Sequence, residues 1–291
     1  MKNFIYRILL FGTFTFFGMA LLVIITASIA RNSFDFKIAD FKNILILGNS
    51  HPECAINDSL IPKTKNLAQS GAAYFYDYLK LKNITKHNKQ IDTVILGYSY
   101  SILQKDMDAW LNAESKINTQ IRYYFFLLDF KDYWTLLSAN PIATLKSTPQ
   151  TIFHNLRMKS KGYSYLGGYK SLSERKLKQA KKYIKPLDIG EIHEYSQYQI
   201  KYLIEIYKFC ESNNISLILI NTPVHPIIEK LHEPLKKGYY DFAKNQLPNT
   251  TLMDHSSFDF PESAYRDLSH LHKTGAEIYS NYLKELLNSK K

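Results

Sequence analysis

Short apolar runs alternate with amphipathic segments along most of this chain. The runs have the length of buried β-strands and cover Asn43–Leu47, Thr64–Leu67, Thr93–Gly97, Ile215–Ile220 and Thr251–Met253. The segments between them carry apolar residues at helical spacing, which predicts helices over Ala72–Lys82, about Ile102–Leu111, Glu191–Asn213 and Ile227–Asn245. Strands that alternate with helices are typical of a parallel sheet with helices on both faces. The pattern therefore predicts an α/β fold.

The start of the last helix is predicted by a capping pattern. Thr274 is followed three residues later by Glu277, which is the spacing of a capping box. The apolar side of this helix is formed by Ala276, Tyr279, Leu283 and Leu287. The pattern predicts that the helix begins at Thr274 and continues to the carboxyl terminus.

The middle of the chain shows no clean alternation. Ile121–Leu128 fits either a strand or part of a helical cap rich in aromatic residues. The stretch from about 129 to 190 is predicted to be an insertion of helices and loops. Within it, Arg175–Lys185 carries six positive charges on a predicted helix, for which a solvated face is the favoured interpretation.

The amino terminus is apolar and long. No charged residue occurs from Ile8 to Ala30, and Lys2 and Arg7 precede this run. Since roughly 20 apolar residues cross the hydrocarbon core of a bilayer, residues 1–30 are predicted to be a transmembrane signal anchor and 31–42 a connector. A cleaved signal peptide is the alternative, because Ser28-Ile-Ala30 resembles a cleavage site, but signal h-regions usually span only about 7–15 residues.

No second apolar run of this length follows the first. The run is therefore predicted to be a single-pass anchor. Residues 43–291 are expected to form one globular domain, with the helical insertion at about 129–190, on the periplasmic or extracellular side.

The composition limits the kinds of partner and cofactor that we expect for this chain. Among 291 residues, 37 Lys and Arg stand against 26 Asp and Glu, a net charge of +11 with neutral histidines. The basic residues are spread along the chain without a nucleic-acid motif, which favours a solvated surface near an anionic membrane over nucleic acid. Cys54 and Cys210 form neither a disulfide framework nor a CxxC site. No cofactor is predicted.

Polar residues follow four of the predicted strands. These turns contain Ser50, Gly71, Tyr98-Ser99 and His225. Ligands of parallel sheets bind outside the carboxyl ends of the strands, so we expect the four turns to share a site. Near the other terminus, Asp267-Leu-Ser-His270 places an acid three residues ahead of a histidine. Serine, histidine and aspartate are the parts of a site for nucleophilic catalysis.

At these residues the chain resembles the SGNH hydrolases, the GDSL-like esterase and lipase superfamily. The resembling blocks are Gly48-Asn49-Ser50-His51, Asn66–Gly71 and Asp267-Leu-Ser-His270. The resemblance implies a flavodoxin-like three-layer sandwich with a central parallel sheet. It also implies a catalytic Ser50, His270 and Asp267, with the N–H groups of Ser50 and Gly71 binding an oxyanion.

One block departs from the family pattern. The third block normally ends in Gly-x-Asn, whose asparagine donates to the oxyanion, whereas this chain has Gly97-Tyr98-Ser99-Tyr100-Ser101. Either the Ser99 hydroxyl substitutes for this donor or the oxyanion hole is smaller, and losing one such donor costs about 10²–10³ in rate.

The resulting hypothesis is a membrane-anchored serine esterase or O-acyltransferase. Ser50 would attack an ester, His270 would act as base, and Asp267 would orient the imidazole. His51, Tyr98 and His225 are candidate substrate-binding residues. The expected substrate is an acylated cell-envelope glycan or lipid, and membrane lipid and a membrane acyltransferase are candidate partners.

Two alternatives stay open. A metal-dependent hydrolase would use His51, Asp267, His270 and His272, although no HExxH or comparable spacing is present. A non-catalytic envelope assembly or binding protein would keep the fold with a degraded site, which the missing asparagine of the third block favours.

Overall fold

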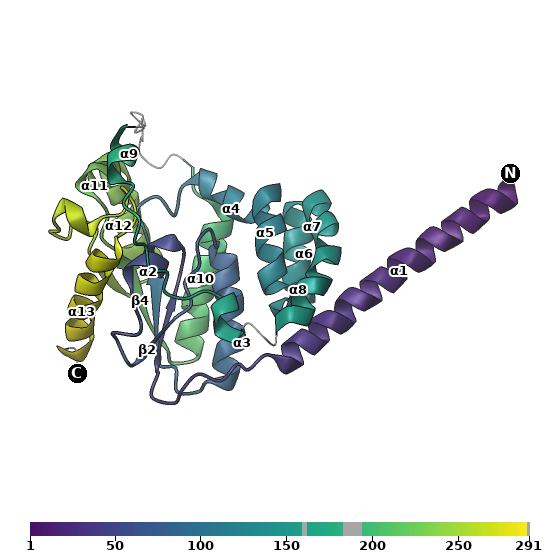
Figure 1. Ribbon diagram of the computed structural model, residues 1–291, viewed down its shortest axis with the longest axis horizontal. Helices are drawn as coiled ribbons and strands as arrows, with labels where there is room; N and C mark the ends of the chain where they lie inside the picture. The colour runs from purple at the N-terminus through teal and green to yellow at the C-terminus, as the bar shows by residue number, and fades with distance from the viewer. Residues whose placement is uncertain (159–161, 183–193, 290–291) are drawn as a thin grey trace. The chain divides into compact units, whose positions relative to one another are not determined.

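The computed structural model describes residues 1–158, 162–182 and 194–289. These residues form two compact units (Figure 1). One unit, the helical unit, comprises residues 1–35 and 112–165. The other, the sheet unit, comprises residues 36–111 and 166–291.

The sheet unit is built on five parallel strands in the order β2-β1-β3-β4-β5. They are β1 (Ile44–Leu47), β2 (Thr64–Asn66), β3 (Thr93–Gly97), β4 (Ser216–Asn221) and β5 (Thr251–Asp254). In register, Leu45 of β1 lies beside Lys65 of β2 and Val94 of β3. This is the flavodoxin-like strand order. All five strands are parallel, but the direction in which successive strands are added to the sheet changes between β1 and β3. The prediction of an α/β fold with a central parallel sheet is confirmed.

Helices cover both faces of this sheet, with α13 on one side and α3 and α10 on the other (Figure 1). The helices of the unit are α2 (Ser50–Ala55), α3 (Tyr74–His87), α9 (Leu177–Lys182), α10 (Gln197–Ser212), α11 (Pro226–Leu231), α12 (Lys236–Gln246) and α13 (Lys273–Ser289). The segment after β3 ends in the short helix α4 (Ala109–Asn112). Because both faces are covered, the central strands are apolar throughout rather than alternating.

Alternate strand residues supply the two sides of the core. Ile44 and Ile46 of β1 and Ile95 of β3 belong to a cluster with Tyr279 and Leu283 of α13. Their sequence neighbours point to the opposite face, as the two-residue period of a strand requires. On the other side of the sheet α3 packs on α10, with the ring of Phe75 edge-on to that of Tyr202 at 5.0 Å.

A buried ion pair joins α3 to the strand ends that precede the polar turns. Asp77 and Lys80 are fully buried, with the ammonium nitrogen 2.8 Å from Asp77 Oδ1. Asp77 Oδ1 also accepts the N–H of Gly48 just after β1, at 3.1 Å. Lys80 donates to the carbonyl oxygen of Leu67 just after β2, at 2.6 Å. The pair therefore fixes the carboxyl ends of two neighbouring strands.

The helical unit contains the amino terminus. Its helices are α1 (Lys2–Ser33), α5 (Glu114–Tyr124), α6 (Phe130–Ala139), α7 (Pro141–Ser147) and α8 (Thr151–Arg157). The first part of α1 is exposed, whereas Val23, Thr26 and Ala30 are buried in the bundle. By length and composition α1 is long and apolar enough to cross a membrane, consistent with a single-pass anchor or a signal sequence.

Of the two alternatives for Ile121–Leu128, the helical one holds through Leu127, since α5 continues to Tyr124 and a 3₁₀ turn covers Phe125–Leu127. Two other local expectations are wrong. The expected helix at Ile102–Leu111 is replaced by a 3₁₀ turn at Lys105–Asp108 and by α4. There, Asp108 accepts the N–H of Tyr198 at 3.0 Å, a contact distant in sequence that local spacing cannot reveal.

The second wrong expectation is the start of the last helix, α13. The ring Nδ1 of His272 accepts the N–H of Thr274 at 3.3 Å, so the helix begins at Lys273 and not at Thr274. The ends of two other expected helices, Lys185 and Glu191, lie outside the described residues.

Removing one member of the buried ion pair tests its role. We expect Lys80→Met to lower the free energy of unfolding by about 3–5 kcal/mol, because it leaves the Asp77 carboxylate buried without its counter-ion. Chemical denaturation measures this loss, with Lys86→Met on the exposed side of the same helix as the matched control. Equal stability of the two variants would contradict the role given to Lys80.

Candidate active site

Ser50 is delivered by a tight turn at the carboxyl end of β1. Gly48 has φ = +125°, a conformation that L side chains rarely adopt, and a Cβ there would lie 3.0 Å from the backbone nitrogen of Gly97. Asn49 then caps α2, its side chain accepting the N–H of His51 at 3.0 Å. Ser50 is the first residue of α2 and is partly exposed. The turn lies beside the β1/β3 switch point, where flavodoxin-like sheets bind ligands.

His270 lies against this serine although 220 residues separate them in sequence. Its Nε2 is 2.9 Å from Ser50 Oγ, and its Nδ1 is 2.9 Å from Asp267 Oδ1. The side chains of His270 and Asp267 keep 23% and 18% of their surface exposed, so solvent or a small substrate reaches them. Ser50, His270 and Asp267 thus form one chain of hydrogen bonds.

Asp267 is held by a turn that it closes itself. Its Oδ1 accepts the backbone N–H groups of Ser269 at 2.9 Å and His270 at 3.0 Å, while its Oδ2 lies 2.6 Å from Arg266 Nη1. Burial opposes ionisation of this carboxyl, but its hydrogen bonds from His270, Ser269 and Arg266 hold its pKa below the ordinary value. An ionised Asp267 requires the proton of the neutral imidazole on Nδ1, which leaves Nε2 free to accept from Ser50.

His51 flanks the same imidazole. The His51 and His270 ring centroids are 5.6 Å apart. Burial, together with the nearby His270 and His232 rings, lowers the pKa of His51 to about 3, and the Asp267 carboxylate opposes this shift. His51 is therefore neutral at ordinary pH and adds no positive charge beside His270.

Backbone donors face no protein acceptor at two of the expected oxyanion positions. Within the described part of the chain, the N–H groups of Ser50 and Gly71 donate to no protein oxygen. Gly71 lies in the turn after β2, next to Ser70, whose hydroxyl donates to Glu53 on α2. That hydrogen bond ties the Gly71 turn to the helix that begins with Ser50.

The segment after β3 alternates between buried and partly exposed residues. The ring of Tyr98 stacks on that of Tyr239 with centroids 4.4 Å apart, and its hydroxyl donates to the Tyr239 carbonyl oxygen at 2.9 Å. Tyr100 donates to Asp254 at the end of β5, at 2.5 Å. Ser99, between these two anchored tyrosines, is partly exposed.

This arrangement corrects the substrate-binding role expected for Tyr98. Its side chain is only 1% exposed and its hydroxyl is already bonded, so it is a core residue. Ser99 is the member of the pair that remains accessible at the end of β3.

His225 also has an internal role. It is 5% exposed and caps α11, with Nδ1 accepting the N–H of Ile227 at 3.2 Å. Its backbone N–H donates to the Leu268 carbonyl oxygen at 3.0 Å, inside the turn that carries the carboxylate and the imidazole. The expected contact of His225 with substrate is therefore corrected to a positioning contact with the Asp267 loop.

His272 does not join the other candidate metal ligands. Its Nδ1 lies 2.9 Å from Thr274 Oγ1 and its Nε2 lies 3.0 Å from the Ser173 carbonyl oxygen, so both ring nitrogens are engaged. Across residues 1–158, 162–182 and 194–289, no group of three or more His, Cys, Asp or Glu side chains is arranged to hold a metal ion. The four-ligand set considered from the sequence is not assembled there.

Sequence reasoning missed three residues around the site. Arg266 pairs with Asp267, and its position directly before the acid was the available signal. His232, just after α11, lies close enough to lower the pKa of the His51 ring. The side chain of Asp77 accepts the N–H of Gly48. Nothing local in the sequence connects either residue to Ser50.

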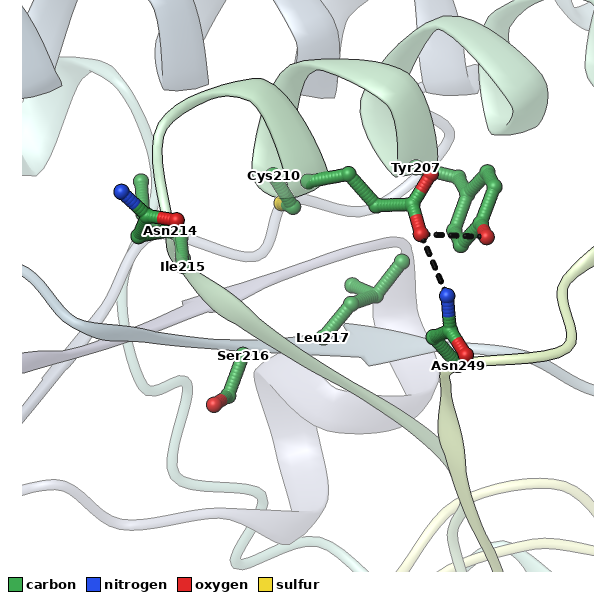
Figure 2. Close-up of a pocket in the computed structure, with 8 residues that line it drawn as sticks. Tyr207, Cys210, Asn214, Ile215, Ser216, Leu217 and Asn249 are labelled. Atoms are coloured by element: carbon green, nitrogen blue, oxygen red, sulfur yellow. Dashed lines mark hydrogen bonds between the residues drawn. The ribbon is translucent and has the colours of Figure 1, made fainter.

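Another hollow lies away from this chemistry. Figure 2 shows a pocket of about 200 Å³ where the end of α10 meets the amino end of β4. Glu211 there accepts from the hydroxyl of Tyr207 at 2.6 Å and from the side-chain amide of Asn249 at 2.7 Å. The pocket is at the opposite end of β4 from the polar turns, so it does not belong to the Ser50 site.

Comparisons with known proteins give weak likenesses. A protein-family model matches residues 170–291, which include the Asp267–His270 turn but not Ser50. Comparison with curated proteins gives no match.

Three solved structures are similar to this chain. A GDSL-like lipase from Bacteroides thetaiotaomicron has 9% identity and a TM-score of 0.38, covering 90% of this chain and 95% of that one. A proposed acylhydrolase from Bacteroides fragilis has 10% identity and a TM-score of 0.39, covering 89% and 93%. A lipase from a goat rumen metagenome has 11% identity and a TM-score of 0.33, covering 84% and 96%. Since these values are low, the chemistry of the site rests on its own geometry.

The depressed pKa of His51 is directly measurable. We expect its ring resonances to stay constant from about pH 7.5 to about pH 5, because an ordinary histidine titrates near 6.5 whereas His51 stays neutral. NMR of the protein, with His51→Gln to assign the signal, follows this titration. The urea-unfolded chain is the control in which the same ring titrates normally, and a folded-state titration near 6.5 would contradict the burial described for His51.

Proposed function

We propose that this protein is a serine esterase or O-acyltransferase, anchored by α1 and acting on an acylated cell-envelope glycan or lipid. The observation that carries the proposal is the hydrogen-bond chain from Ser50 Oγ through both ring nitrogens of His270 to Asp267 Oδ1, with both distances at 2.9 Å. The ionised Asp267 favours the tautomer of the neutral imidazole with its proton on Nδ1, so Nε2 is the atom that accepts the serine proton.

The first chemical step forms an acyl-enzyme. Ser50 Oγ attacks the ester carbonyl carbon while its proton passes to Nε2 of His270. The carbonyl π electrons move to oxygen, and the ionised Asp267 stabilises the imidazolium that results. As the C–O bond to the leaving alcohol breaks, Nε2 returns the proton to that oxygen. Ser50 then carries the acyl group as an ester.

The second step releases the acyl group from Ser50. His270 removes a proton from the incoming acceptor, whose oxygen attacks the serine ester, and then returns the proton to Ser50 Oγ. Water as acceptor gives an esterase, and a sugar hydroxyl gives a transferase. Both reactions use the same three side chains.

The negative oxygen of each intermediate needs donors that are not already in use. The N–H groups of Ser50 and Gly71 meet this condition among the described residues. The partly exposed hydroxyl of Ser99 is the third candidate donor, in place of the asparagine expected from the family resemblance. Such donors contribute strongly because they are oriented before the charge develops.

The substrate class follows from the anchor. A long apolar helix at the amino terminus would keep the site close to a membrane, and the net charge of +11 would favour anionic lipid or glycan nearby. We therefore propose a periplasmic or extracellular site with an envelope polymer or lipid as acyl carrier, and a membrane acyltransferase as a partner.

A second candidate function is a non-catalytic envelope assembly or binding protein with a degraded site. The absence of an asparagine after β3 favours it, because Tyr98 is buried and only the Ser99 hydroxyl is left at that position. The two candidates differ in whether Ser50 is reactive.

Reactivity of Ser50 separates these candidates. We expect a fluorophosphonate probe to label the full chain, and Ser50→Ala to abolish labelling and lower p-nitrophenyl acetate turnover about 10⁴-fold or more. Ser59→Ala, an exposed serine just beyond α2, is the matched control and should retain both signals. If the wild type is unlabelled, or if Ser50→Ala is labelled equally, the non-catalytic function is supported instead.

The carboxylate has a distinct signature. We expect Asp267→Asn to lower kcat about 10⁴-fold with little change in KM, because an amide no longer holds the proton of His270 on Nδ1. Steady-state kinetics on the same ester give both constants. Asp259→Asn, at an exposed position of the same loop, should behave as wild type. Parallel kinetics of the two variants would remove Asp267 from the mechanism.

A further inference from the structure

Exposed apolar side chains gather on the helical unit. Among the described residues that follow α1, eleven large hydrophobic side chains are exposed, and six of them lie between residues 130 and 156. The six are Phe130 and Trp134 on α6, Ile142 and Leu145 on α7, and Phe153 and Leu156 on α8. We call this set the apolar rim. Soluble surfaces rarely concentrate large apolar residues in this way.

The expected depth of the rim in the membrane follows from the part of α1 that the other helices of the unit contact. If the hydrocarbon part of α1 starts at Ile8, after the last charge of the amino terminus, about 20 residues carry it to Ala27. The bundle buries Val23, Thr26 and Ala30, so it contacts α1 within the last turns of that span. Arg31 then donates to the carbonyl oxygens of Phe126 at 2.8 Å and Leu128 at 2.7 Å, which fixes this depth.

The orientation of the bundle agrees with that depth. In Figure 1, α6 and α7 lie on the side of the bundle toward which the amino-terminal half of α1 extends. An apolar cleft of about 630 Å³ runs along α1 between Ala20 and Arg31 and is closed on its other side by Phe125, Leu128 and Phe130. The cleft is wide enough to hold an acyl chain.

Charge in this part of the chain complements an anionic surface. Residues 112–165 contain seven Lys and Arg against three Asp and Glu. Basic residues near a membrane surface are attracted to anionic lipid. Exposed apolar side chains within a basic segment are typical of a protein surface that lies in the membrane interface.

We propose that the apolar rim is a lipid-binding surface, seated in the bilayer interface beside α1, with a phospholipid acyl chain in the α1 cleft. This inference rests on the proposed anchoring by α1 and does not depend on the chemistry of Ser50. The rim would then be a second, peripheral attachment that limits rotation of the helical unit about α1.

The two tryptophans of the chain make a direct test. Trp134 belongs to the rim and Trp110 lies in the sheet unit, so Trp134→Phe leaves Trp110 as the single tryptophan and isolates the Trp134 signal by difference. The full chain is reconstituted in vesicles of phosphatidylethanolamine and phosphatidylglycerol, with or without phosphatidylcholine brominated near the headgroup end of its acyl chains. We expect bromolipid to reduce the Trp134 emission, taken as wild type minus Trp134→Phe, about twofold, as for a ring ~5–10 Å into the boundary.

Each outcome decides the inference. Flotation with the vesicles is scored first, and failure to float overturns the anchoring proposal and this inference together. A chain that floats, but whose Trp134 emission is quenched by aqueous iodide and not by bromolipid, overturns the inference alone. Shielding of Trp134 from both quenchers would assign the rim to contact between copies of this chain, which also overturns it. Fluorophosphonate labelling of Ser50 stays intact in all these cases if the proposed chemistry is right.

Discussion

The hydrogen bond between Ser50 and His270 joins two turns that are 220 residues apart, and the proposed chemistry depends on it. It exists because parallel strands bring all their carboxyl ends to one edge of the sheet, so that residues following different strands can meet. The reversal of strand order between β1 and β3 opens that edge beside Ser50. The chain that follows β5 must then pass back over the end of β4 to bring His270 to Ser50. The N–H of His225 holds this segment by donating to the carbonyl oxygen of Leu268.

The surroundings hold the serine still while leaving it accessible. Beneath it, the buried Asp77–Lys80 pair fixes the ends of β1 and β2. Beside it, His51 stays neutral and adds no positive charge next to His270. Rigid support under partly exposed reactive groups is what catalytic geometry requires, because a small displacement of an attacking atom costs a large factor in rate.

The two units divide the physical tasks. The sheet unit is stabilised by burial of strands on both faces, and Ser50 lies just beyond the end of β1. The helical unit keeps a long apolar helix and an apolar rim exposed, which is favourable only against lipid or another apolar surface. The proposed function needs both properties, since an attacking serine must stay in water while a membrane anchor lies in hydrocarbon.

What the sequence determined by itself was local. Strands appeared as short apolar runs, α1 as a long uncharged run, and the Asp267–His270 turn as a three-residue spacing, because period, length and turn closure depend on neighbouring residues. Tertiary structure decided the rest. It selected helix over strand at Ile121–Leu128, buried Tyr98 and His225 while leaving Ser99 accessible, and brought His232 near His51. Burial and long-range contact depend on how elements pack, and residues that pack together carry no mark of it in their local sequence.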